Sequence, residues 1–162
     1  MIIMQKNYKD IIQVSDTTYI LDILIDIQDD EATYTYRTRN SANQYIDIEF
    51  YKYQPSKFSK EFYWSICLYV NKRSKGYEYK KQTGKAGIES LLVAKEILKY
   101  HINLIKEVYY DYDNTIYIWA DDIRRFNAYK RGLIDLEFVE GNYKGRCLYK
   151  KIASVKRNGW PP

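Results

Sequence analysis

The segment from Tyr79 to Leu98 constrains the fold of this chain more than any other part of the sequence. A run rich in aromatic and β-branched residues precedes it and predicts a strand. Residues from about Gly87 to Lys106 keep the period of an amphipathic helix. Between them lies a short loop with Gly84, Gly87 and three lysines. Because the first N–H groups of a helix lack intrahelical acceptors, such a loop favours a bound phosphate.

An ordinary strand-to-helix turn explains the same loop, because glycine and lysine are common in such turns. The loop lacks the Gly-Lys-Ser/Thr ending of a Walker A sequence. With Gly84 and Gly87 alone it also lacks the dinucleotide-binding GxGxxG pattern. A phosphate site and a plain turn therefore both remain open from these residues.

Length and composition predict one folded domain spanning residues 1–162. A hydrophobic content of 46%, with 19 tyrosines, excludes the class of disordered chains. No apolar run is long enough to span a membrane, and Met1–Lys6 has no signal-peptide pattern. We therefore expect a cytoplasmic protein without a membrane partner. The net charge of +5 permits an anionic ligand or nucleic acid without requiring either.

Cysteine and histidine are too few for metal or nucleophile chemistry. Cys67 and Cys147 lie in strand-like runs, which is typical of small buried residues. His101, on the long helix, is the only histidine. A zinc site and a His-dependent nucleophile are therefore not expected, and we predict no metal cofactor.

The part of the chain before the loop predicts mainly strands. Thr18–Gln28 fits both a strand and a helix, and a helix is favoured because Ser15 or Asp16 reads as an N-cap. The strands expected around it are Asp10–Val14, Thr33–Arg39, Gln44–Tyr53 and Glu61–Tyr69. A turn at Asn71–Gly76 then leads to a last short strand at Tyr77–Tyr79. These strands predict an antiparallel meander that leads into the loop.

The part after the long helix predicts a strand, a helix and a hairpin. The expected elements are a strand at Thr115–Ala120, a helix at Ile123–Leu136 capped by Asp121 or Asp122, a hairpin of Phe138–Glu140 with Arg146–Ile152, and a loose tail at 153–162. A strand, a helix and a strand in this order imply a parallel pair joined by a crossover. The fold class is therefore α+β.

The residues Lys81-x-x-Gly84-Lys85-Ala86 resemble the Arg/Gln-x-x-Gly-x-Gly/Ala loop of the GNAT family of N-acetyltransferases. In that family the loop binds the pyrophosphate of acetyl-CoA through its backbone amides, between the fourth strand and the long central helix. The predicted element order over about residues 10–152 is similar to the family's order. The resemblance implies a GNAT-like mixed, mostly antiparallel twisted sheet. A central helix would follow the glycine loop, and a C-terminal helix and hairpin would close the fold.

The resemblance further implies an acetyl-CoA-dependent N-acyltransferase in which an amine acceptor attacks the thioester directly. The residues that it assigns to acetyl-CoA are Tyr79, Lys81, Gln82, Thr83, Gly84, Lys85, Ala86 and Gly87. Leu136-Glu137-Phe138 stands at the family's Leu-Gly-Phe, and Leu148–Lys151 stands at its last strand. This chain departs from the pattern at Lys81, where the family has Arg or Gln.

The catalytic residues are less well matched than the loop. The family's general acid, a tyrosine five residues before the phenylalanine, corresponds to Leu133. Tyr129, one helical turn earlier, is the alternative acid, although an amphipathic core residue explains it equally. The candidate bases on the meander are Asp47, Glu49 and Glu78, which also fit solvent-facing strand residues. Glu78 is preferred because it lies just before the loop.

Two hypotheses from other classes remain open. One is an inactive GNAT-like binding or virion-associated module, which the missing tyrosine and Lys81 favour. The other is a basic, aromatic nucleic-acid-binding protein, because Tyr34–Arg39 and Tyr51–Tyr53 interleave tyrosines with cations. Ordinary exposed sheet explains that texture too. The sequence defines neither the amine acceptor, a small molecule or a protein, nor the oligomeric state.

Overall fold

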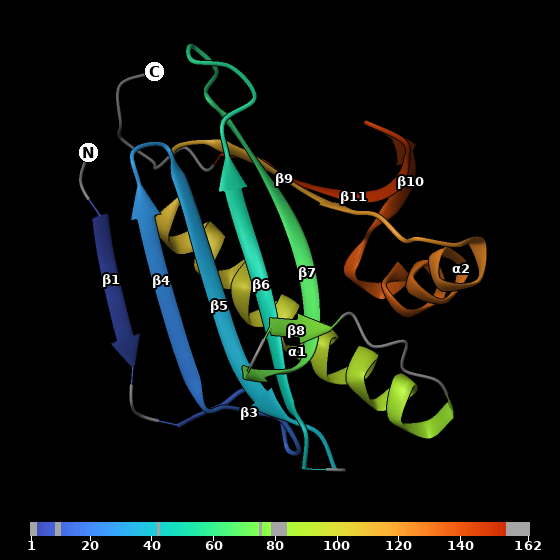
Figure 1. Cartoon of the computed structure of the whole chain (residues 1–162). Helices are drawn as coiled ribbons and strands as arrows, with labels where there is room; N and C mark the ends of the chain where they lie inside the picture. The colour runs from blue at the N-terminus through green and yellow to red at the C-terminus, as the bar shows by residue number, and fades with distance from the viewer. Residues whose placement is uncertain (1–2, 9–10, 42, 75, 79–83, 155–162) are drawn as a thin grey trace. The chain divides into compact units, whose positions relative to one another are not determined.

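The computed structural model of the chain describes residues 3–8, 11–41, 43–74, 76–78 and 84–154. These residues form an α+β structure with a mostly antiparallel sheet, as predicted (Figure 1). They belong to two compact units, Met1–Lys52 with Ile66–Tyr100 and Tyr53–Ser65 with His101–Pro162. The elements that run through both units are β6 (Tyr45–Tyr53), β7 (Glu61–Ser74) and α1 (Gly84–Val108). That the chain is a single domain stays a prediction.

The sheet of the first unit is an antiparallel meander. Its strands lie in the order β1 (Ile3–Tyr8), β4 (Asp22–Gln28), β5 (Glu31–Arg39) and β6 (Figure 1). A separate two-stranded sheet is formed by β2 (Ile12–Gln13) and β3 (Tyr19–Ile20). The strands expected at Thr33–Arg39 and Gln44–Tyr53 are confirmed, whereas β1 was not predicted.

The preference for a helix over Thr18–Gln28 is wrong, because this segment forms β3 and β4. Ser15 does act as a cap, but of a turn. Its Oγ accepts the N–H groups of Thr17 and Thr18 at 3.4 and 3.0 Å. The isoleucines that follow are β-branched and suit a pleated sheet, and β4 pairs with β1 on one side and β5 on the other. Strand pairing therefore overrides the helical spacing of the apolar residues.

The core of the first unit is built from alternate residues of its central strands. The buried uncharged residues of β5 and β6 are Ala32, Tyr34, Tyr36, Thr38, Ile46, Ile48 and Phe50. The part of α1 in this unit adds buried Val93, Ile97 and Leu98. Tyr36 packs edge-on against Phe50 and Tyr100, with ring centroids 5.6 and 5.8 Å apart. These tyrosines therefore serve the hydrophobic core.

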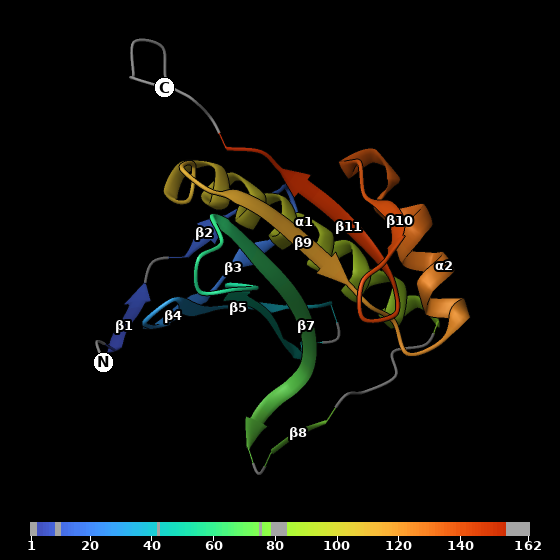
Figure 2. The same ribbon diagram turned by 90° about the horizontal axis from the view of Figure 1, so that it is seen from above.

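The second unit contains the parallel pair that the sequence predicts. Residues Glu61–Ser65 of β7 run parallel to β9 (Asp113–Ile118), from Glu61 opposite Asp113 to Ser65 opposite Tyr117. On its other side β9 pairs antiparallel with β11 (Arg146–Ile152), and β11 pairs with β10 (Val139–Asn142). Figure 2 shows β11 between β9 and β10. The crossover is confirmed, but its first strand is Glu61–Ser65 and not the stretch directly before the loop.

A network of buried hydrogen bonds joins β7, β9 and the residues that follow α1 in the second unit. The indole Nε1 of fully buried Trp64 donates to Asn114 Oδ1 at 2.9 Å. Asn114 Nδ2 donates in turn to the carbonyls of Tyr109 and Tyr112 at 3.1 and 3.0 Å, just after α1. Trp64 also packs edge-on against His101, with ring centroids 4.7 Å apart. The indole is therefore satisfied while its ring fills the core.

The C-terminal helix is shorter than expected. Asp122 is its N-cap as predicted, and its carboxylate accepts the N–H of Arg125 at 2.8 Å. The helix α2 (Ile123–Gly132) then gives way to a short 3-10 turn at Ile134–Leu136. The predicted hairpin follows, with its turn at residues 143–145 instead of Gly141-Asn142.

Of the predicted loose tail, residues 153–162, the structure describes only residues 153 and 154. Ser154, the last described residue, donates its backbone N–H to Asp113 Oδ1 at 2.8 Å. The start of the tail is therefore tied to the beginning of β9, and residues 155–162 lie outside the described part of the chain.

Candidate functional site

The glycine segment of the sequence opens the long helix. The helix α1 begins at Gly84, three residues earlier than expected, so Gly84–Gly87 form its first turn. Their N–H groups are those that an α-helix leaves without an intrahelical acceptor, and this turn contains no acidic residue. The helix dipole therefore favours an anion at this end. Of the other expected contacts, Tyr79, Lys81, Gln82 and Thr83 lie outside the described residues.

Glu78, the preferred base, lies on a hairpin strand. It belongs to β8 (Gly76–Glu78), which pairs antiparallel with β7, placing Glu78 opposite Val70 and Gly76 opposite Ser74. The turn expected at Asn71–Gly76 is therefore shorter than predicted, because β7 continues to Ser74. Glu78 lies close to the glycine segment in sequence. The strand that pairs with β9, however, is β7, through Glu61–Ser65, and not β8.

The other candidate bases on the meander differ in environment. Asp47 is only 3% exposed and accepts two bonds from the Arg37 guanidinium, from Nε at 2.7 Å and from Nη2 at 2.8 Å. This bond and the negative charge of Asp47 raise the pKa of Arg37 above its ordinary value, against the lowering effect of burial. With both carboxylate oxygens engaged, Asp47 is a structural partner of Arg37. Glu49 is half-buried opposite Thr35.

Tyr129, the candidate acid, lies half-buried on α2 in the second unit. Burial raises the pKa of its phenol, with smaller contributions from Asp121 and Asp122, while Arg125 lowers it. A phenol with a raised pKa keeps its proton at neutral pH and can only donate it. Leu133, at the family's acid position, is a buried core residue. Glu78 and Gly84–Gly87 belong to the first unit, so the expected catalytic and cofactor residues are divided between the units.

The second unit carries a group of aromatic residues that the sequence analysis missed. We call it the tyrosine face; it consists of Tyr53, Tyr63, Tyr117, Trp119 and Tyr143. The ring of Tyr143, from the turn between β10 and β11, lies over Tyr117 with centroids 4.6 Å apart. Trp119 Nε1 donates to the carbonyl of Tyr143 at 2.9 Å and so holds the turn against the sheet. In the sequence, the alternation of aromatic residues at 117 and 119 could have indicated this group.

Hydrogen bonds between hydroxyl groups join the tyrosines of this face in two pairs, Tyr53 with Tyr143 and Tyr117 with Tyr63. Burial raises the pKa of Tyr53, and a hydrogen bond with Tyr143 raises it further. Burial likewise raises the pKa of Tyr117, which bonds with Tyr63. The Lys144 ammonium lies 5.9 Å from the Tyr53 ring centroid and 5.4 Å from that of Tyr143. At these distances the ammonium is weakly attracted to the faces of the two rings.

Two of the tyrosines that suggested nucleic-acid stacking, Tyr34 and Tyr36, are buried. Tyr34 and Tyr36 are 4% and 0% exposed, so their faces are not open to a base. Lys52, between Tyr51 and Tyr53, is 5% exposed and donates to the carbonyl of Asp30 at 2.9 Å. Tyr34, Tyr36 and Lys52 therefore offer no exposed ring or cation for base stacking, whereas Tyr51 and Tyr53 are half-buried.

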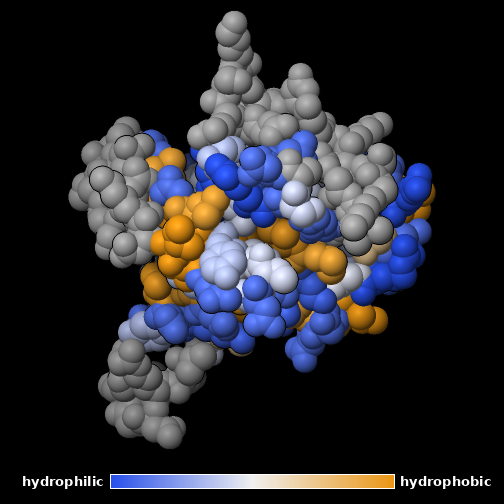
Figure 3. Space-filling view, turned by 90° about the horizontal axis from the view of Figure 1, so that it is seen from below, coloured by the Kyte–Doolittle hydropathy of each residue, from blue (hydrophilic) through white to orange (hydrophobic). Residues whose placement is uncertain are grey.

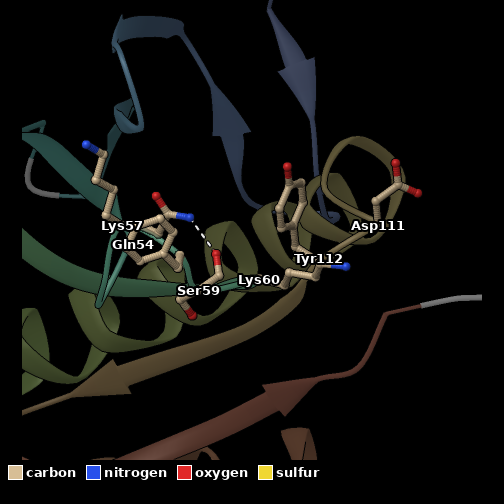
Figure 4. A pocket seen from close by; sticks show the side chains of 7 residues that line it. Gln54, Lys57, Ser59, Lys60, Asp111 and Tyr112 are labelled. Atoms are coloured by element: carbon tan, nitrogen blue, oxygen red, sulfur yellow. Dashed lines mark hydrogen bonds between the residues drawn. The ribbon is translucent and has the colours of Figure 1, made fainter.

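A surface pocket of about 340 Å³ lies in the second unit beside the turn that follows β6 (Figure 4). Its lining residues are Gln54, Lys57, Phe58, Ser59, Lys60, Asp111 and Tyr112. The turn is closed by Gln54 Nε2, which donates to the carbonyl of Ser59, and Phe58 at its tip is 91% exposed. The lining includes one carboxylate, of Asp111, and two lysines, Lys57 and Lys60, so the charges of this pocket select no single class of ligand.

Two features are absent from the described part of the chain. Its residues include no group of three or more His, Cys, Asp and Glu side chains that could hold a metal ion. Neither described helix is long and apolar enough to cross a membrane. Comparison with protein-family models, with curated proteins and with solved structures found no match for this chain. The function must therefore be argued from the residues themselves.

Proposed function

We propose that this chain is an acetyl-CoA-dependent N-acyltransferase with a GNAT-like fold. The observation that carries the proposal is the start of α1, where Gly84–Gly87 form a first turn free of acidic residues. In sequence this helix, after the short strand β8, lies between β7 and β9, which are parallel strands. The loop that resembles the family's pyrophosphate loop thus leads directly into the helix that makes the crossover.

The backbone of this turn suits the diphosphate of acetyl-CoA. Its N–H groups point out of the helix end, and the dipole adds a positive partial charge there. Binding through main-chain groups needs no particular side chain, so Lys81 in place of Arg or Gln is compatible with the proposal. Lys81 and Lys85 add charge in the same short stretch.

The reaction is direct transfer of the acetyl group to an amine. The amine nitrogen attacks the thioester carbonyl carbon, the C–S bond breaks, and CoA leaves as a thiolate. Glu78 takes the proton that the amine loses, directly or through a water molecule, and Tyr129 gives a proton to the thiolate. As a phenol, Tyr129 is protonated at neutral pH and can donate to the thiolate as it forms, although burial, which raises its pKa, makes it a weaker acid.

Two features of this chain depart from the family pattern. The expected helix near residues 18–28 is replaced by β3 and β4, so the shared element order begins at the meander. Leu133 stands where the family has its acid, which leaves that role to Tyr129. Both departures favour the alternative of an inactive binding module, and turnover must be measured separately from binding.

Calorimetry with acetyl-CoA tests the binding step. We expect micromolar affinity, and Gly84→Glu should abolish the heat because its carboxylate repels the diphosphate at the helix end. Gly132→Glu is the matched control, since nothing lies within 4 Å of a Cβ at Gly132 on α2. No heat from the unaltered protein would overturn the proposal.

Release of the CoA thiol in the presence of simple amines tests the chemical step. Tyr129→Phe should keep acetyl-CoA affinity and lower the rate about 100-fold or more, because a general acid contributes about that much. Glu78→Gln should act similarly and shift the pH profile of the rate. Binding without turnover by the unaltered protein for any amine would instead support the inactive module.

A further inference from the structure

A second pocket, of about 520 Å³, lies in the first unit where the β2–β3 hairpin meets the end of β5. Its lining residues are Ile11, Thr17, Tyr19, Leu21, Thr38 and Arg39. The volume falls within the range of about 300 to 1,000 Å³ typical of small-molecule sites, which are mainly apolar with a few polar groups. Figure 3 views the molecule from below, the side where Figure 1 draws β3, and shows hydrophobic residues exposed among hydrophilic ones.

The guanidinium of Arg39 is held in a fixed position at this pocket. Its Nη1 donates to Asn43 Oδ1 at 3.0 Å, and its Nη2 donates to the Tyr45 hydroxyl. The guanidinium carbon lies 4.4 Å from the centroid of the Tyr45 ring. Asn40 and Gln44, which lie on either side of Asn43, are joined by a hydrogen bond from Asn40 Nδ2 to Gln44 Oε1 at 2.9 Å. A side chain fixed by stacking and two bonds loses little freedom when it binds a ligand.

Arg39 differs from the arginine two residues before it on the same face of β5. Arg37 donates two bonds to Asp47, so its charge is matched within the protein. No carboxylate forms an ion pair with Arg39 among the residues that the structure describes. Its two bonds to neutral oxygens use two of the five N–H donors that a guanidinium carries. The remaining donors suit a carboxylate supplied by a ligand.

We propose that this pocket binds a small monocarboxylate with an apolar body, aromatic or branched aliphatic. The carboxylate accepts N–H groups of Arg39, and the body covers the side chains of Ile11, Tyr19 and Leu21. Thr17 adds an exposed hydroxyl at the pocket. Removal of exposed Ile11 and Tyr19 from water contributes to affinity, and the charge-assisted bonds select the acid over a neutral analogue. This site is separate from the acetyl-CoA proposal and does not depend on it.

Phenylpropionate and its neutral amide test the proposal by calorimetry or ligand-observed NMR. The unaltered protein should bind phenylpropionate at least about tenfold more tightly than phenylpropionamide, because only the acid forms charge-assisted bonds. Arg39→Gln should weaken phenylpropionate by a similar factor and leave the amide unchanged. Ile11→Ser should weaken both ligands, since it removes part of the apolar wall.

Arg131→Gln is the matched control, because it removes the same charge from the last turn of α2 in the other unit. It should leave both affinities unchanged. Circular dichroism checks that Arg39→Gln folds, and the acid–amide comparison on the unaltered protein stands even when that variant does not. Equal affinity for acid and amide, or an absence of binding at millimolar phenylpropionate, would falsify the proposal.

Discussion

The two units of this protein keep polar groups in their interiors in different ways. In the first unit, Asp47 and Arg37 form a charged pair with two hydrogen bonds, and the side chain of Asp47 is 4% exposed. In the second unit, Tyr117 is 9% exposed and bonds through a neutral hydroxyl to Tyr63. A charged pair depends on both partners at once, because a single buried charge is costly. A neutral phenol loses only one bond when its partner goes, so the tyrosine face should tolerate changes of polarity better than changes of volume.

The largest effect is expected for Arg37→Met with Asp47 retained. This change leaves the buried Asp47 carboxylate without its partner, and we expect a loss of about 3 to 5 kcal/mol in the free energy of unfolding. Urea denaturation followed by circular dichroism measures it. The double variant Arg37→Met, Asp47→Leu should recover most of the loss, because no charge then remains buried.

Arg125→Met provides the control for this charged pair. Arg125 lies 3.5 Å from Asp121, whose side chain is 88% exposed, so its loss should cost less than about 1 kcal/mol. Similar costs for Arg37→Met and Arg125→Met would contradict the distinction between a buried and an exposed pair.

Crowding of the aromatic rings in the second unit predicts the next effect. A Cβ at Gly141 would lie 2.5 Å from Tyr149 Cε1, so Gly141→Ala must displace that ring. We expect a loss of about 1 to 3 kcal/mol in unfolding free energy, as for overpacked cores. Gly132→Ala, where nothing lies within 4 Å, should be neutral or stabilising by up to about 1 kcal/mol. Equal effects of the two substitutions on the urea midpoint would show that the ring moves freely.

Removing one hydroxyl from the tyrosine face should have a smaller effect. Tyr117→Phe keeps the ring and deletes the bond to Tyr63, so we expect a loss of about 1 kcal/mol. Tyr19→Phe, at an exposed tyrosine of β3, is the control and should change unfolding free energy by less than about 0.5 kcal/mol. A Tyr117→Phe cost as large as that of Arg37→Met would remove the contrast between the units.

The sequence predicted those elements whose signals are local. The long helix was found from its apolar period. The pair Asp121-Asp122 was recognised as a cap because aspartate is a preferred N-cap residue, and Asp122 is the one whose carboxylate accepts the N–H of Arg125. Strands β5 and β6 alternate strongly enough to be seen alone. The parallel pair followed from chain order, although it is Glu61–Ser65 that pairs with β9.

Features set by contacts between distant residues were not predictable. The segment Thr18–Gln28 has both periodicities, and only its pairing with β1 and β5 decides for a strand. A strand at Glu78 was predicted, but its pairing opposite Val70 in a short hairpin was not, because no local pattern marks it. The tyrosine face combines residues from three parts of the chain. Its ring over Tyr117 comes from the turn before Gly145, whose φ of 110° favours glycine.

Alkaline titration compares the two units through the ionisation of single side chains, because it acts on phenols and not on the Arg37–Asp47 pair. Burial raises the pKa of Tyr53 and Tyr117 in the second unit, and burial with a bond to Glu31 raises that of Tyr51 in the first to about 12. In the unfolded chain these phenols ionise near pH 10. Their stabilising contribution is therefore complete below pH 10 and is lost as the pH rises toward the folded values.

Absorbance of phenolate at 295 nm measures this titration. We expect a late group of phenols, which includes Tyr51, to ionise at about pH 12 or with unfolding. Tyr117→Phe should reduce the late group by one phenol. If the late absorbance change is the same in Tyr117→Phe as in the unaltered protein, Tyr117 does not titrate late, and its burial does not protect the phenol from ionisation.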